Sequence, residues 1–132
     1  MKRVILAKSA GFCFGVSRSV KMAEELLQSG PCKCLGPLIH NRDVVDRLES
    51  MGMSVIDSCA GARSGDRVLI RSHGAPRAEL EELRHRGAEV VDATCPFVAR
   101  IHKIVVNASA AGRQVIVIGS AGHAEVEAIC GW

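Results

Sequence analysis

The side chains most capable of chemistry stand where short apolar runs give way to helical patterns. They are two thiols, three imidazoles and one carboxylate, namely Cys13, Cys95, His40, His73, His123 and Glu125. Thiolates are soft ligands that hold iron–sulfur clusters. Imidazoles beside helix N-termini suit a phosphorylated ligand, because exposed N–H groups and the positive end of the helix dipole favour anions. Together these residue types indicate a redox centre beside a phosphate pocket.

Short aliphatic runs alternate with longer helical patterns along the whole chain. The expected strands cover residues 4–7, 34–35, 53–56, 67–70, 89–91 and 114–118, and the last of these has the clearest strand pattern. The expected helices cover residues 16–27, 44–51, 76–86, 96–111 and 124–129. Strands that alternate with helices predict parallel βα units, and therefore an α/β fold whose sheet is covered on both faces.

A parallel sheet would bring the six reactive residues together, because ligands of open α/β sheets bind outside the carboxyl ends of the strands. Cys13, His73 and Cys95 each come just after an expected strand. Thr94 is expected to cap the helix that follows, with Pro96 at its first position. Each reactive residue also has a plain structural explanation, such as a buried thiol or a turn histidine. Their coincidence at one sheet edge favours a site.

The other cysteines and histidines receive no functional role. Cys32 and Cys34 would point to the same side of a strand, where core packing is favoured over metal binding. Those left unassigned are His85, His102, Cys59 and Cys130. No cysteine pair has the C-x-x-C spacing, so the sequence indicates neither a zinc finger nor a thioredoxin-like motif.

The composition is that of a globular protein. The chain has 132 residues, 48% of them hydrophobic, and a net charge of +3, which excludes disorder. Its longest aliphatic run, Val115–Ile118, is far shorter than the roughly 20 residues of a membrane span. The apolar stretch near the start is too short for a signal peptide, so we expect a cytoplasmic protein. With three Phe, one Trp and no Tyr, the chain lacks a stacking platform for single-stranded nucleic acid.

Five motifs occur in the order found in one enzyme family. They are Gly11-Phe12-Cys13-Phe14-Gly15-Val16, Gly36-Pro37-Leu38-Ile39-His40-Asn41, Arg71-Ser72-His73-Gly74, Asp92-Ala93-Thr94-Cys95-Pro96 and His123-Ala124-Glu125-Val126. In these motifs the chain resembles the 4-hydroxy-3-methylbut-2-enyl diphosphate reductase family, also called LytB or IspH. The resemblance covers the whole chain. Ala124 departs from it, because the family usually has proline there, but His123 and Glu125 stay in register.

The resemblance implies an oxidoreductase of the non-mevalonate route of isoprenoid biosynthesis. Such an enzyme removes the allylic hydroxyl of its diphosphate substrate with two electrons and two protons, which gives isopentenyl and dimethylallyl diphosphate. The implied fold is a trefoil of three α/β units around a [4Fe–4S] cluster, and the implied electron donor is a ferredoxin or a flavodoxin. No nucleic-acid or membrane partner is implied. By motif, the cluster ligands are Cys13 and Cys95, the diphosphate-binding residues are His40, His73 and His123, and the proton donor is Glu125.

The resemblance also implies that the chain is incomplete. Residues 1–94 would form the first α/β unit, and residues 95–132 would begin the second. The third cysteine ligand and the serine, asparagine and threonine substrate contacts of the family come from further downstream. We therefore expect a fragment that is inactive in isolation, and nothing in the family supports Cys130 as a substitute ligand.

Two other functions stay open at this point. The chain could be a stand-alone, non-catalytic α/β module that binds a metal or a phosphate through Cys13, Cys95 and further cysteines. A flavodoxin-like nucleotide binder is the third possibility, but no phosphate-loop sequence opens a helix here. All site predictions require that Cys13 and Cys95 lie on the same side of the folded molecule.

Overall fold

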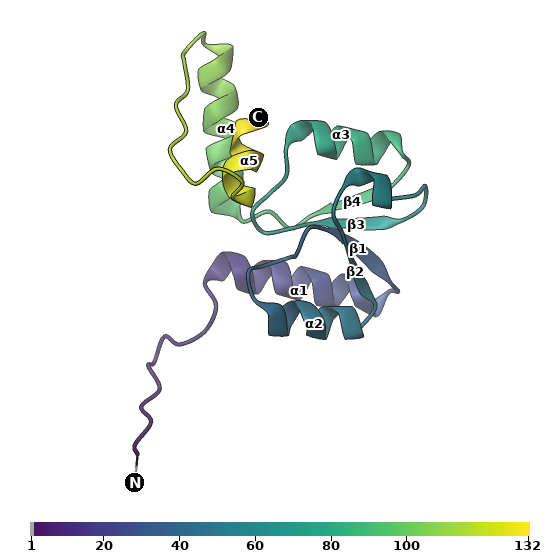
Figure 1. The fold of residues 1–132 in the computed structure, drawn as a ribbon, viewed down its shortest axis with the longest axis vertical. Coiled ribbons are helices and arrows are strands. Elements are labelled where there is room, and N and C mark those ends of the chain that lie inside the picture. The colour runs from purple at the N-terminus through teal and green to yellow at the C-terminus, as the bar shows by residue number, and fades with distance from the viewer. Residues whose placement is uncertain (1) are drawn as a thin grey trace.

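The core of the fold is a parallel four-stranded sheet with the order β2-β1-β3-β4. A computed structural model of the chain describes residues 2–132 (Figure 1). The strands are β1 (Cys32–Leu35), β2 (Met53–Ile56), β3 (Arg67–Ile70) and β4 (Glu89–Asp92). Cys34 in β1 pairs with Val55 of β2 and with Leu69 of β3. The predicted parallel α/β fold is thus confirmed.

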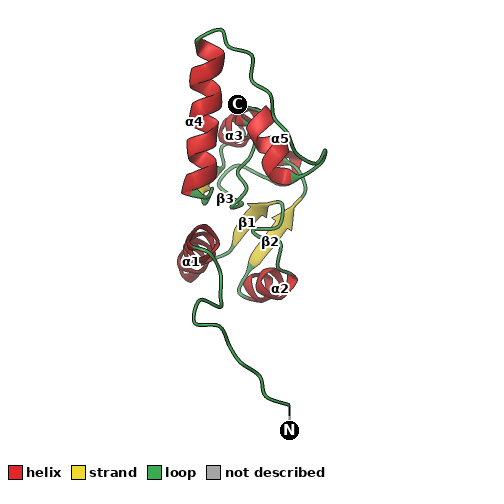
Figure 2. Cartoon of the chain, turned by 90° about the vertical axis from the view of Figure 1, so that its left-hand side faces the viewer, coloured by secondary structure: helices red, strands yellow, loops and turns green. Residues whose placement is uncertain are grey.

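Helices cover both faces of this sheet, as the sequence pattern requires. The first face carries α1 (Phe14–Gln28) and α2 (Arg42–Ser50), and the second carries α3 (Arg77–His85) and the short 3-10 helix η1 (Cys59–Gly61) (Figure 1). Helices α4 (Pro96–Ala110) and α5 (Ala124–Cys130) pack against each other beside this unit (Figure 2). Within residues 2–132, no helix has both the length and the apolar character that crossing a membrane requires.

The strands divide the core into two apolar clusters because their side chains alternate between faces. Cys34 and Leu69 join the cluster with α1 and α2. Val68 and Ile70 join the cluster with α3. Cys32 and Cys34 are both buried in the first cluster, so the prediction that they pack in the core is confirmed. Burial raises the pKa of the Cys34 thiol to about 12, which keeps it protonated.

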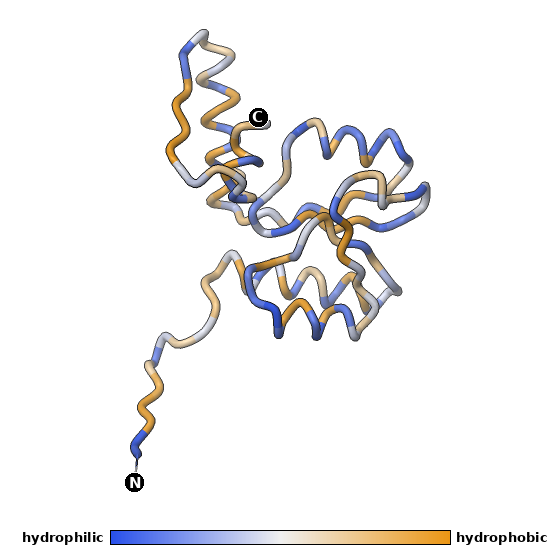
Figure 3. Tube along the Cα trace, in the orientation of Figure 1, coloured by the Kyte–Doolittle hydropathy of each residue, from blue (hydrophilic) through white to orange (hydrophobic). Residues whose placement is uncertain are grey.

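Residues 4–7 were predicted as a strand, and this prediction is wrong for the described structure. The segment has no regular structure and extends away from the sheet (Figure 1). Its side chains face solvent, with Val4 91% and Leu6 82% exposed. Figure 3 shows it as a hydrophobic stretch with no other segment of the chain beside it. A strand needs a neighbour for its backbone hydrogen bonds, and the described sheet is made of other segments.

Residues 114–118 had the clearest strand pattern, yet they also form no strand. Ile116 and Ile118 are exposed, the latter at 94%. The segment leads from α4 back to α5 along the outside of the molecule (Figure 1). The physical reason is the same as for residues 4–7. An apolar pattern shows that a segment is suited to burial, but it does not show that another strand lies beside it to accept and donate hydrogen bonds.

A buried leucine and an exposed leucine give a direct test of this fold. Leu69→Ala removes a fully buried side chain of β3 and should lower the free energy of unfolding by about 2–5 kcal/mol. Leu6→Ala, in the exposed N-terminal segment, should change it by no more than about 0.5 kcal/mol. Urea unfolding followed by circular dichroism measures both. Similar losses for the two variants would mean that residues 4–7 are packed.

Candidate active site

Three imidazoles meet beyond the strands of the sheet. The ring centroids of His40 and His73 are 4.4 Å apart. The His123 ring lies 5.6 Å from that of His40 and 5.8 Å from that of His73. These three residues, called the histidine triad below, come from the loop after β1, the loop after β3 and the start of α5. The structure therefore places together three residues that the sequence separates widely.

Hydrogen bonds to one carbonyl join the loops of His40 and His73. The backbone N–H of Ser72 and its hydroxyl both donate to the Leu38 carbonyl, each at 3.1 Å. Asn41 follows His40 and caps α2, because its side-chain oxygen accepts from the Val44 N–H at 3.1 Å. The positions of His40 and His73 thus depend on the main chain of their loops.

His123 is held by its own helix. Its Nδ1 accepts a hydrogen bond from the Glu125 backbone N–H at 3.2 Å, so the imidazole itself caps α5. A neutral ring that accepts at Nδ1 carries its proton on Nε2. Nε2 is therefore the donor that His123 can offer to a ligand. Glu125, half-buried in the first turn of α5, is tied to the triad through this hydrogen bond.

The surroundings of His73 disfavour its charged form. Its pKa is lowered to about 4, first by burial and then by the positive charges of His40, Arg71 and His123. Its Nδ1 is buried with no hydrogen-bond partner among residues 2–132. An anion placed among the three rings would reverse the electrostatic part of this shift, so the triad is suited to receive negative charge.

The two candidate ligand cysteines begin two helices. Cys13 is exposed and directly precedes α1, while Cys95 is half-buried and directly precedes α4. A Cβ added to Gly15 would overlap the Cys95 Sγ, so this sulfur lies on the first turn of α1, two residues from Cys13. The starts of α1 and α4, which carry the two cysteines, are therefore adjacent.

Two hydrogen bonds hold the Cys95 loop in this place. Arg18 of α1 donates to the Thr94 carbonyl at 3.2 Å. The Cys95 N–H donates to the Ser72 carbonyl at 2.9 Å, which connects the loop to the neighbour of His73. The predicted cap by Thr94 is wrong, because its hydroxyl bonds to Asp92 at 2.5 Å. Pro96 opens α4 as predicted.

The donor set fits one side of an iron–sulfur cluster. Sulfur is the preferred ligand of such clusters, and the structure offers two thiols on adjacent helix starts. Across residues 2–132, no three Cys, His, Asp or Glu side chains are arranged to hold a metal ion.

A small cavity of about 240 Å³ separates the start of α1 from the triad. Its lining residues are Phe12, Val16, Ile39, His40, Asn41, Ser72 and His73. Its lining is divided in kind between the apolar side chains of Phe12, Val16 and Ile39 and the imidazoles of His40 and His73. This division suits a ligand with a hydrocarbon part and an anionic part.

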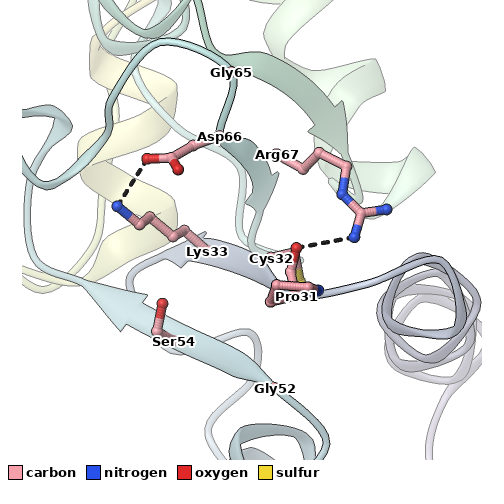
Figure 4. A pocket seen from close by; sticks show the side chains of 8 residues that line it. All are labelled: Pro31, Cys32, Lys33, Gly52, Ser54, Gly65, Asp66 and Arg67. Atoms are coloured by element: carbon pink, nitrogen blue, oxygen red, sulfur yellow. Dashed lines mark hydrogen bonds and ion pairs between the residues drawn. The ribbon is translucent and has the colours of Figure 1, made fainter.

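A second cavity, of about 290 Å³, lies at the opposite edge of the sheet, where β1, β2 and β3 begin (Figure 4). Its charged groups already have partners. Lys33 pairs with Asp66 at 2.7 Å, and Arg67 donates to the Pro31 carbonyl at 2.9 Å. Because these charged groups already pair with one another or with the main chain, they are not available to bind a ligand. The candidate site is therefore the histidine triad.

Sequence reasoning missed two residues that position Cys95, Gly15 and Arg18. Gly15 stood within a quoted motif, but only the contact with Cys95 shows why glycine is needed there. Arg18 lies inside a helix, and no sequence signal identified its hydrogen bond to the Thr94 carbonyl.

Comparison with known proteins agrees with this geometry. Residues 4–132 match the family described as LytB protein. A protein of Geobacter metallireducens is 48% identical over 127 residues, covering 96% of this chain and 45% of the relative. One of Aquifex aeolicus is 42% identical over 134 residues, covering all of this chain and 46% of the relative. Both relatives are named 4-hydroxy-3-methylbut-2-enyl diphosphate reductase.

Solved structures give the same result. A structure of (E)-4-hydroxy-3-methyl-but-2-enyl diphosphate reductase matches with a TM-score of 0.82 and 43% identity, over 97% of this chain and 46% of that one. The corresponding reductase of Plasmodium falciparum matches with a TM-score of 0.90 and 28% identity, over 94% and 40%. The chain thus spans somewhat less than half the length of the proteins it matches.

Gly15→Ala tests the contact between α1 and Cys95. In most helices this change stabilises a protein by roughly 0.5–1 kcal/mol. Here the added methyl group would overlap the Cys95 Sγ, so we expect a loss of about 1–3 kcal/mol in the free energy of unfolding, measured with urea. Ser17→Ala, at an exposed position of the same helix, is the control. A stabilised Gly15→Ala variant would show that the two elements are not in contact.

The lowered pKa of His73 predicts a pH dependence of stability. Between pH 6.5 and about 4, the unfolded chain binds a proton at His73 that the folded chain does not. Stability is therefore present above pH 6.5 and is lost as the pH falls towards 4. His73→Gln should flatten this part of the profile in urea unfolding at a series of pH values. His85→Gln, at an exposed position of α3, should leave it unchanged; a flattening of equal size would contradict the assignment.

Proposed function

The chain belongs to the LytB protein family, and on this premise we propose that it is part of a 4-hydroxy-3-methylbut-2-enyl diphosphate reductase. The observation that carries the proposal is the histidine triad, whose rings lie within 6 Å of each other beside two helix-starting cysteines. The reaction removes the allylic hydroxyl of the substrate as water, with two electrons and two protons. Its products are isopentenyl and dimethylallyl diphosphate.

The triad would bind the diphosphate group. His123 offers an Nε2 donor, because its Nδ1 is occupied by the Glu125 N–H. His73 is neutral in the free protein and would gain a proton as the anion enters, because the anion offsets the cost of its charge. The apolar side chains that line the 240 Å³ cavity would contact the hydrocarbon part of the substrate. Binding energy at the diphosphate would then orient the reacting end.

Cys13 and Cys95 would hold a [4Fe–4S] cluster together with a third cysteine from outside the described residues. When bound, such a cluster supplies single electrons and an iron with an open coordination position. The protein's own part is to fix both sulfurs at helix starts. Gly15 does so by allowing close approach, and Arg18 by its hydrogen bond to the Thr94 carbonyl.

Glu125 would deliver protons to the leaving hydroxyl and to the allylic carbon. Its backbone N–H binds the His123 ring, so the carboxyl is carried by the same helix start as a diphosphate ligand. A general acid must lie within hydrogen-bond reach of the group it protonates. Attachment of Glu125 and His123 to one turn fixes the proton donor relative to the bound substrate.

The proposal also assigns the parts of the chain. Residues 1–94 would be the first unit of a trefoil, and residues 95–132 would begin the second. A ferredoxin or a flavodoxin would supply electrons to the cluster, and the reaction would run in the cytoplasm.

A chimera tests the proposal. In the Geobacter metallireducens relative, the segment that matches this chain is exchanged for this chain. The chimera is then reconstituted with iron and sulfide in the absence of oxygen. We expect cluster absorbance and reduction of the diphosphate substrate. Cys13→Ser and Cys95→Ser should each lower the iron and sulfide content and reduce turnover by more than about 100-fold, the upper end of the loss that follows removal of a partner that only orients a metal ligand. Cys130→Ser, outside the site, is the control.

Two results would contradict the proposal. Turnover that survives Cys13→Ser and Cys95→Ser would show that these sulfurs hold no cluster. Stoichiometric, chelator-resistant zinc in the 132-residue chain after aerobic purification would instead favour a stand-alone metal-binding module.

A further inference from the structure

His102 is a buried histidine that the proposed mechanism does not use. It lies on α4, and only 4% of its surface is exposed. Its Nε2 is buried and has no hydrogen-bond partner among residues 2–132. A buried polar atom without a partner costs about 1–3 kcal/mol, and phenylalanine could fill the same space without this cost. The presence of nitrogen at this position therefore calls for a physical explanation.

The ring of His102 lies between an aromatic side chain and a tight turn. On one side it stacks on Trp132, with centroids 5.0 Å apart and planes inclined by 17°. On the other side it meets Gly74, where an added Cβ would lie 2.7 Å from Cε1 and 3.4 Å from Nε2 of His102. Gly74 directly follows His73 and has a φ of +80°, a backbone conformation that favours glycine. The edge of the ring that includes Cε1 and the unpaired Nε2 thus lies against the turn that carries a triad member, with Cε1 the nearer of the two atoms.

The end of the chain holds the same turn from another direction. The Trp132 indole N–H donates to the Ala75 carbonyl at 3.1 Å. The Arg77 N–H donates to the Gly131 carbonyl at 3.2 Å. The segment after His73 is therefore fixed by α4 through His102 and by the residues after α5. Because α5 begins at His123, the same packing relates two members of the triad.

From this geometry we propose that His102 is a positioning residue for His73. Its Nε2 forms a hydrogen bond with the main chain of the turn at residues 73–75 when a diphosphate occupies the triad, and this bond holds the His73 ring against the anion. Hydrogen bonds of this kind are often long in a free site and shorten in the complex. The inference rests on the proposed function, because it requires that the triad binds diphosphate.

Replacement by phenylalanine separates this role from simple packing. His102→Phe keeps an aromatic ring against Trp132 and removes both nitrogens, at the cost of one added ring carbon. The affinity of the 132-residue chain for inorganic diphosphate, measured by calorimetry, should fall about 2- to 10-fold, the range expected for one lost hydrogen bond. The urea unfolding midpoint should stay the same or rise, because the unpaired buried atom is gone. His102→Gln, whose amide can reach the position of Nε2, should recover part of the affinity.

His85→Phe is the matched control, because His85 is exposed on α3, and it should bind diphosphate like the unmodified chain. Unchanged affinity in a folded His102→Phe variant would overturn the inference and leave the diphosphate site intact. Equal losses of affinity and stability in the Phe and Gln variants would overturn it as well, because that result indicates a packing role alone. An unmodified chain that binds no diphosphate would overturn the triad as a binding site and the inference with it.

Discussion

The arrangement of the site depends on the hydrogen bonds of one buried serine. Ser72 donates twice to the Leu38 carbonyl, which fixes the His73 loop against the loop of His40. Its own carbonyl accepts from the Cys95 N–H, which fixes the start of α4 against the same point. Three loops that carry an imidazole, a second imidazole and a thiol are thus connected through a single residue at the end of β3. The parallel sheet makes this possible, because it delivers all these loops to one edge.

Burial and neighbouring positive charge act together at the triad, because both lower the pKa of His73. His73 avoids protonation in the free protein because its surroundings are dry and already basic. An entering anion would supply negative charge beside His73, so the ring would become protonated only as the ligand binds. His123 contributes differently, since its tautomer is set by the Glu125 N–H and not by burial. The triad therefore combines one ring, His73, whose protonation is disfavoured mainly by burial with another, His123, whose tautomer is set by a hydrogen bond at a helix start.

Sequence reasoning succeeded where the relevant physics is local. Residues 67–70 and all five helices could be predicted because periodicity reports which faces of an element are apolar. The rule that parallel strands present their loops at one edge predicted that His40 and His73 lie together, because they follow β1 and β3. His123 joins them although the strand expected before it is absent. The strands expected at residues 4–7 and 114–118 failed, because hydropathy cannot say which segment lies alongside.

The same limit applies to the site. The contact of Gly15 with Cys95 and that of His102 with Gly74 join residues far apart in the chain. No spacing or periodicity encodes such contacts, because they arise from the way whole elements pack. Residue types therefore predicted what chemistry the site could do, whereas the parts that hold it in place appeared only in three dimensions.

The exposed apolar stretches have a consequence for handling the chain. Extended segments with unpaired backbone groups are templates for intermolecular β-pairing, and flanking charges oppose it. Val4–Leu6 is enclosed by Lys2, Arg3 and Lys8, which act as gatekeepers on both sides. Residues 115–118 have a basic neighbour, Arg113, on one side and only Gly119 and Ser120 on the other. The second stretch is thus the less protected, and aggregation of concentrated solutions would begin there.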